Sequence, residues 1–210
     1  MRRLLFALLS AITLPVLAAA PEPMSSDPVR DREHPPAVAE LAITSAGKRL
    51  PGHIYIANGP GPHPTVVLLH GFPGNEKNLD IAQALRRAGF NVLFFHYRGA
   101  WGAEGSYRIV QLPDDVAAVL AYLRTPENAE RLRVNVDKLS LLGHSLGGWA
   151  SLAAGSQDPD VACLGAMAPV NLGRWKSGLA QDDANAQRDF NIALNELTNV
   201  LEPKRQRKQT

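Results

Sequence analysis

The sequence contains one cysteine, few aromatic residues and, beyond residue 20, no long run of apolar side chains. Because Cys163 has no second cysteine to pair with, an internal disulfide is excluded. No segment after residue 20 approaches the roughly 20 consecutive apolar residues that a membrane-spanning helix needs. The sequence also lacks clusters with metal-ligand spacing and a glycine-rich phosphate-binding loop. We therefore expect no metal, no cofactor and no stable membrane span in the mature chain.

Basic side chains are not gathered into a stripe. The net charge is +2, of which Arg2 and Arg3 supply +2 and the segment 202–210 supplies +3, so residues 4–201 carry −3. A mildly acidic body of this kind argues against nucleic-acid binding. The basic segment 202–210 is predicted to be a frayed tail. Composition does not define an oligomeric state.

The first 20 residues have the pattern of a signal peptide. Arg2 and Arg3 precede an apolar stretch over residues 4–17, and small residues follow it before Pro21. An uncleaved membrane anchor is the alternative. Export without disulfides favours a bacterial periplasm or exterior, so we expect a periplasmic or secreted protein. Residues 21–40, rich in proline and charge, are predicted to be a linker without fixed structure.

Residues 41–170 alternate between strand and helix patterns, and 45% apolar content suits one domain with a sizeable core. This alternation predicts an α/β fold whose mostly parallel sheet has helices on both faces. Loops that follow parallel strands meet at one sheet edge, where ligands bind. The expected strands cover 41–50 and 53–57, joined by a turn at Pro51-Gly52, then 64–70, 91–97, 138–142 and 161–170, with helices near 81–88, 113–123 and 148–154.

The pentapeptide Gly143-His144-Ser145-Leu146-Gly147 fits the pattern G-x-S-x-G between a strand and a helix. Side chains flanking so tight a turn would clash, which explains glycine at both flanking positions. The turn exposes the Ser145 hydroxyl and aims the Leu146 N–H at the place where a carbonyl oxygen becomes negative. The alternative is a glycine-rich turn that only packs tightly, because the pattern arises by chance in about one such chain in ten.

A second motif, His70-Gly71-Phe72-Pro73-Gly74, follows the strand predicted at 64–70. The two motifs, with a helix, a strand and a helix between them, resemble the α/β-hydrolase superfamily over about residues 41–170. The glycine-rich loop 98–107, followed by Asp114-Asp115, is similar to that of the dienelactone hydrolase and prolyl-oligopeptidase-like branches. The resemblance implies a serine hydrolase that cleaves a small-molecule ester or amide through an acyl-enzyme.

The resemblance also implies roles for individual residues. Ser145 would be the nucleophile, and the backbone N–H groups of Phe72 and Leu146 would form the oxyanion hole. His70 is expected to brace its own loop. Gly71, Gly143 and Gly147 would support the two motifs, and the tight turn around Ser145 would require the last two.

The sequence departs from the family pattern after Val170. In the family an acid and a histidine follow later strands, but here residues 171–201 are predicted to form a cap-like or lid-like helical segment, and no histidine follows His144. We therefore expect an incomplete triad and a chain that is inactive or weakly active, whether it is a fragment, a frameshifted product or a pseudoenzyme. The alternative function is a non-catalytic α/β-hydrolase-like binding protein. His70 is the nearest candidate base.

Four other side chains allow two interpretations each. Asp114 and Asp115 are expected to cap a helix and complement its dipole rather than to act as catalytic acids. Trp101 and Tyr107 either line a substrate pocket or cover the core.

Overall fold

A computed structural model describes residues 23, 25–174 and 188 of the chain. The predicted signal peptide and the basic tail lie outside the described residues, as does most of the predicted cap segment. Export and the cap therefore stay predictions.

The core is a six-stranded, mostly parallel sheet with the strand order β1-β2-β4-β3-β5-β6, which confirms the predicted fold class. The pairs β3–β4, β3–β5 and β5–β6 are parallel, whereas β2 runs antiparallel to both β1 and β4. All five residues of β4 are buried, as expected for a parallel strand covered on both faces. The strands are β1 (Ala37–Ser45), β2 (Lys48–Ile56), β3 (His63–Leu69), β4 (Asn91–Phe95), β5 (Val134–His144) and β6 (Cys163–Met167).

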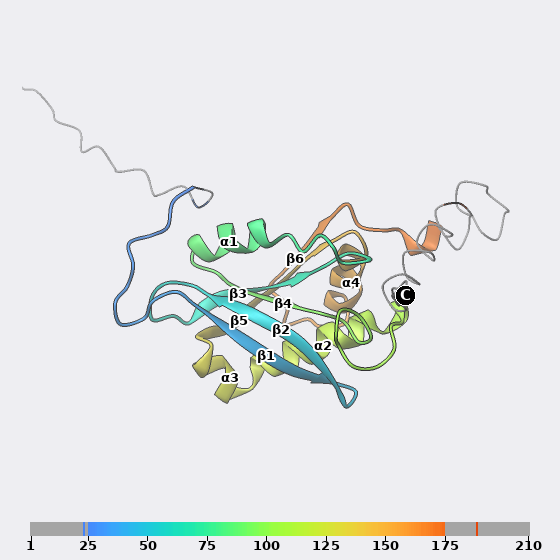
Figure 1. The fold of residues 1–210 in the computed structure, drawn as a ribbon, viewed down its shortest axis with the longest axis horizontal. Helices are drawn as coiled ribbons and strands as arrows, with labels where there is room; N and C mark the ends of the chain where they lie inside the picture. The colour runs from blue at the N-terminus through green and yellow to red at the C-terminus, as the bar shows by residue number, and fades with distance from the viewer. Residues whose placement is uncertain (1–22, 24, 175–187, 189–210) are drawn as a thin grey trace, which may run out of the picture.

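Helices cover both faces of the sheet (Figure 1). On one face Ala82 of α1 packs with Leu68 and Val92, while α2 and α4 contribute to the larger core on the other face. The short helix α3 was not predicted, because none of its residues is buried and it leaves no periodic apolar signal. The helices are α1 (Leu79–Arg87), α2 (Leu112–Arg124), α3 (Pro126–Arg131) and α4 (Leu146–Gly155), with a single 3₁₀ turn, η1 (Ile109–Gln111), before α2.

The predicted turn of the opening hairpin was wrong. The chain turns at Ala46 and Gly47, which have φ values of 46° and 71°, and Pro51-Gly52 lies inside β2. A Cβ on Gly52 would stand 2.7 Å from the carbonyl oxygen of Phe94 on the neighbouring strand. Glycine at this position therefore marks a close approach of two backbones rather than a turn.

The predicted unstructured linker was also wrong for the described residues up to residue 40. Asp27 forms an ion pair with Arg86 at 2.7 Å, and the guanidinium of Arg133 donates hydrogen bonds to the carbonyl oxygens of His34 and Pro35 at 3.1 and 3.0 Å. Strand β1 then begins at Ala37. Composition suggested disorder, but side chains distant in sequence supply the partners that this backbone needs.

Asp115 does not cap its helix. Its side chain is fully buried and accepts hydrogen bonds from the Ser45 hydroxyl at 2.7 Å and from the Arg98 backbone N–H at 3.0 Å, in addition to an ion pair with the Arg98 guanidinium. Asp114, in the same first turn, is 75% exposed and lies 3.7 Å from Arg98. A buried ion pair thus joins the β1–β2 hairpin, the loop after β4 and the start of α2.

Candidate active site

Ser145 occupies the sharp turn that the sequence predicted. It lies directly between β5 and α4, with φ 55° and ψ −117°, a combination that L-amino acids seldom adopt. A Cβ on Gly143 would stand 2.0 Å from the carbonyl oxygen of Gly147, and a Cβ on Gly147 would stand 2.2 Å from that of Leu69. Any side chain at either position would overlap the backbone, so the turn requires both glycines.

Hydrogen bonds to neighbouring segments hold this strained turn. The Ser145 N–H donates to the Met167 carbonyl at 2.9 Å, and the Ser145 carbonyl accepts from the Val170 N–H at 3.1 Å and the Trp149 N–H at 3.2 Å. The turn is therefore fixed to the carboxyl end of β6 and to the first turn of α4. Such surrounding contacts are what allow a residue to keep a strained backbone conformation.

The loop after β3 lies against the serine. A Cβ on Gly71 would stand 3.0 Å from the Ser145 Cβ and 3.2 Å from the His144 carbonyl oxygen, so this loop packs directly on the turn. Among the described residues, neither the Phe72 N–H nor the Leu146 N–H has a hydrogen-bond acceptor. One free donor, the Leu146 N–H, directly follows the serine, and the other, the Phe72 N–H, belongs to the residue after Gly71, which packs against the serine. Their convergence on one oxygen stays a prediction.

His70 braces the loop after β3. Its Nδ1 donates to the Gly71 carbonyl at 2.7 Å, and the Tyr97 hydroxyl donates to the His70 carbonyl at 3.2 Å. Because a carbonyl only accepts, Nδ1 carries the proton and Nε2 of the neutral ring is left as an acceptor, buried and without a partner. Burial, and to a smaller extent the positive charge of Lys77, lowers the pKa of His70 to about 4, although the hydrogen bond to Gly71 acts in the opposite direction.

The histidines of this structure do not form hydrogen bonds with Ser145. All six histidines of the sequence fall among the described residues, and none has a hydrogen bond with the Ser145 hydroxyl. The ring of His144 turns toward the loop after β3, where its Nδ1 would lie 3.5 Å from a Cβ on Gly71. His63 instead bonds the Gly59 carbonyl at 3.1 Å.

Three histidines gather around Phe94 on the face of the sheet that α1 covers. The His53 and His96 rings lie 5.5 and 5.1 Å from the Phe94 ring, and the His70 and His96 rings are 5.3 Å apart. Burial, and then the neighbouring His70 and Lys77, lower the pKa of His96 to about 3; burial also lowers the pKa of His53. Sequence analysis missed this cluster because strand register, which opposes His53 to Phe94, creates it.

This cluster predicts loss of stability in acid. A histidine with a depressed pKa in the folded state stabilises the fold fully above its unfolded pKa of about 6.5, and that stability is lost as the pH falls toward the folded pKa. For His70 we expect a loss of about 2 kcal/mol in unfolding free energy between pH 8 and pH 5. Urea unfolding at both pH values measures it. His70→Gln should reduce the pH dependence, whereas the same substitution at exposed His34 should not; equal pH dependence in both variants would contradict the prediction.

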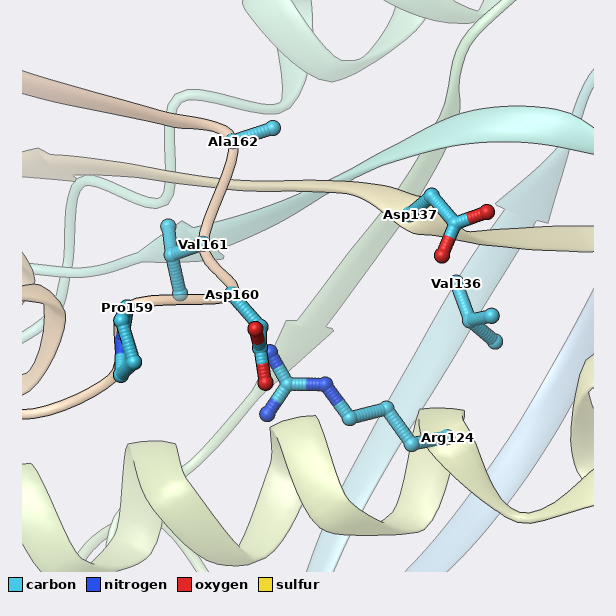
Figure 2. Close-up of a pocket in the computed structure, with 7 residues that line it drawn as sticks. All are labelled: Arg124, Val136, Asp137, Pro159, Asp160, Val161 and Ala162. Carbon is cyan, nitrogen blue, oxygen red and sulfur yellow. The ribbon is translucent and has the colours of Figure 1, made fainter.

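A cavity of about 560 Å³ lies at the opposite edge of the sheet (Figure 2). It is bordered by residues near the start of β5, by the loop 159–162 that precedes β6, and by Arg124 from the last turn of α2. Figure 2 shows the Arg124 side chain extending toward this loop, beside the Asp160 carboxylate. Arg124 is already paired with Asp158 at 2.6 Å. Because Ser145 follows the other end of β5, this cavity is separate from the serine.

Within the part of the chain that the structure describes, no group of three or more His, Cys, Asp or Glu side chains is placed to hold a metal ion. None of the described helices combines the length and the apolar character needed to cross a membrane.

A family model described as the alpha/beta hydrolase fold matches residues 64–202, so the chain belongs to the α/β-hydrolase family. The superfamily resemblance predicted from the two motifs is thereby confirmed. The match begins at β3 and includes both the loop after β3 and the turn at Ser145.

Three similar proteins extend this comparison. An uncharacterized 31.7 kDa protein from the traX-finO intergenic region of Escherichia coli is 33% identical over 107 residues, which cover 49% of this chain and 36% of that protein. Two solved structures are 26% identical: the α/β hydrolase GrgF from Penicillium sp. sh18 (TM-score 0.54; 74% of this chain and 55% of that one) and the 2,6-dihydroxy-pseudo-oxynicotine hydrolase (TM-score 0.50; 63% and 36%). The chain thus spans about a third of the length of the curated relative.

Proposed function

We propose that this chain is a serine hydrolase scaffold for acyl transfer, acting on a small-molecule ester or amide with Ser145 as the nucleophile. The observation that carries the proposal is the strained conformation of Ser145 at the strand-to-helix turn, with the loop after β3 packed against it. Membership of a family whose solved relatives include hydrolases supports the same reaction class. The finer assignment to the dienelactone hydrolase branch, and export, stay predictions.

In the proposed reaction the Ser145 oxygen attacks the carbonyl carbon of the substrate, and the carbonyl oxygen takes the negative charge. The free N–H groups of Phe72 and Leu146 would stabilise that charge. Collapse of the tetrahedral intermediate re-forms the carbonyl, expels the alcohol or amine and leaves an acyl group on Ser145. Water then hydrolyses this ester, which releases the acid and restores the hydroxyl.

We propose that this chain performs the reaction slowly. A serine at its ordinary pKa is a weak nucleophile that needs a base within hydrogen-bond reach. Since none of the six histidines reaches Ser145, its proton passes to water rather than to an imidazole. A preorganised oxyanion hole can still leave a residual acceleration of about 10³ over the reaction in water.

Labelling with a fluorophosphonate tests this proposal, because the reagent reacts covalently with an activated serine. We expect slow labelling of the wild type that Ser145→Ala abolishes, and hydrolysis of a p-nitrophenyl ester close to background. Ser156→Ala is the matched control, because Ser156 lies at the other end of α4 and its hydroxyl donates only to the Ala153 carbonyl. Fast turnover lost in both Ser145→Ala and His70→Ala would make His70 the base and overturn the slow reaction proposed here.

The lack of a hydrogen bond between any of the six histidines and the Ser145 hydroxyl also favours a second candidate, a non-catalytic binding protein with the hydrolase fold. In that case the fluorophosphonate would not label Ser145 at all, while the variants would remain folded. Mass spectrometry of the treated wild type separates the two candidates, because one adduct on Ser145 excludes an inert serine.

A further inference from the structure

Trp101 adopts a backbone conformation that bulky residues avoid. Its φ is 49°, and it lies in the loop after β4 between Gly99 and Gly102, whose φ values are 75° and 86°. A left-handed conformation at a non-glycine residue is strained and persists only where surrounding contacts enforce it. Trp101 is also 42% exposed, so covering the core does not account for its position.

The contacts that hold Trp101 lead to the loop after β3. Its indole Nε1 donates a hydrogen bond to the Pro73 carbonyl at 2.6 Å. A Cβ on Gly74 would stand 2.8 Å from that nitrogen and 2.6 Å from the Nδ1 of His70, so Gly74 is enclosed between the two rings. The ammonium of Lys77 lies 5.8 Å from the centre of the Trp101 ring.

Two side chains therefore hold this loop, and they belong to segments that follow two different strands. His70, at the end of β3, bonds the carbonyl of Gly71, and Trp101, in the loop after β4, bonds the carbonyl of Pro73. Phe72, whose N–H is free, lies between these two carbonyls in the chain. β3 and β4 are parallel neighbours, so both loops leave the same edge of the sheet.

We infer that Trp101 is a positioning residue, which fixes the Phe72 N–H beside Ser145 through its hydrogen bond to Pro73; the inference rests on the proposed acyl-transfer function. A preorganised donor stabilises a developing oxyanion because it does not have to reorient during the reaction. With the Pro73 carbonyl released, the loop loses the hydrogen bond on the far side of Phe72 and keeps the one at Gly71. The donor then has to be ordered during each reaction, which slows the chemical step without changing how the reagent binds.

Substituting Trp101→Phe in the full chain tests the inference, because phenylalanine keeps an aromatic ring and removes the N–H. With the fluorophosphonate we expect the maximal labelling rate of Ser145 to fall about tenfold. This loss is smaller than the rate loss of about 10²–10³-fold that follows when an oxyanion donor is removed outright. The reagent concentration at half-maximal rate should stay within about twofold. Tyr122→Phe is the control, since it removes one side-chain hydrogen bond, at 2.9 Å to Arg131, on α2 and α3.

Hydrogen–deuterium exchange gives a second readout that does not depend on chemistry. We expect the peptide over residues 71–77 to exchange at least tenfold faster in Trp101→Phe, with unchanged exchange over residues 143–150. Labelling within twofold of the wild type, or unchanged exchange over 71–77, would overturn the positioning role. A wild type that is not labelled at all would instead overturn the proposed function and the positioning role with it, while exchange would still show whether Trp101 holds the loop.

Discussion

Replacing Gly147 with alanine is expected to remove about 4 kcal/mol of unfolding free energy, a large share of the 5–15 kcal/mol typical of a domain. The new Cβ would stand 2.2 Å from the carbonyl oxygen of Leu69 and 2.6 Å from that of His70. Overpacking usually costs about 1–3 kcal/mol when side chains can move. Here the obstacle is the backbone of β3, which is held in register with β5, so the strand pairing itself has to shift.

Gly155→Ala on the same helix is the matched control. The three atoms nearest to a Cβ there all belong to the Leu164 side chain, which is 39% exposed and can move aside more easily than a backbone. Alanine is also the better helix former, by about 1 kcal/mol. Urea unfolding followed by circular dichroism should therefore show a large loss for Gly147→Ala and little change for Gly155→Ala. A loss below about 1 kcal/mol for Gly147→Ala would contradict the close packing at the Ser145 turn.

Asp115→Ala is expected to destabilise the fold by about 3–5 kcal/mol, the usual effect of removing one partner of a buried ion pair. The substitution leaves the Arg98 guanidinium, whose side chain is only 12% exposed, without its main carboxylate. It also leaves the Ser45 hydroxyl and the Arg98 N–H without their hydrogen-bond acceptor, because both donate to Asp115. Three segments lose their common partner at once, so the unfolding midpoint in urea should fall sharply.

The adjacent Asp114→Ala supplies the comparison. Asp114 is 75% exposed and 3.7 Å from the same guanidinium, and exposed pairs contribute about 0–1 kcal/mol. Replacing both buried partners, as in Arg98→Met with Asp115→Leu, should recover much of the loss, because no charge is then buried alone. Equal losses for Asp114→Ala and Asp115→Ala would show that burial does not govern this pair.

Sequence patterns with a local cause predicted the structure well. The apolar run after residue 63 became β3. Gly143 marked a turn whose steric requirement, the close approach to the Gly147 carbonyl, acts within five residues. Composition failed where the partners were distant: the stretch before β1 was expected to be disordered, but Arg133 binds its carbonyls. The sequence predicted a turn at Gly52. The residue is instead glycine because it approaches a strand that lies about 40 residues later in the chain.

The sequence by itself determined the alternation of the main strands and helices, the family, and the position of the serine in the G-x-S-x-G turn, because each depends on periodicity or on a short motif. Only the tertiary structure decided what surrounds that serine. The pairing of β3 with β5 brings Gly71 against Ser145, and the pairing of β3 with β4 brings Trp101 to the Pro73 carbonyl. These contacts join segments about 30 to 75 residues apart, and strand pairing, which no local pattern specifies, sets which side chains meet.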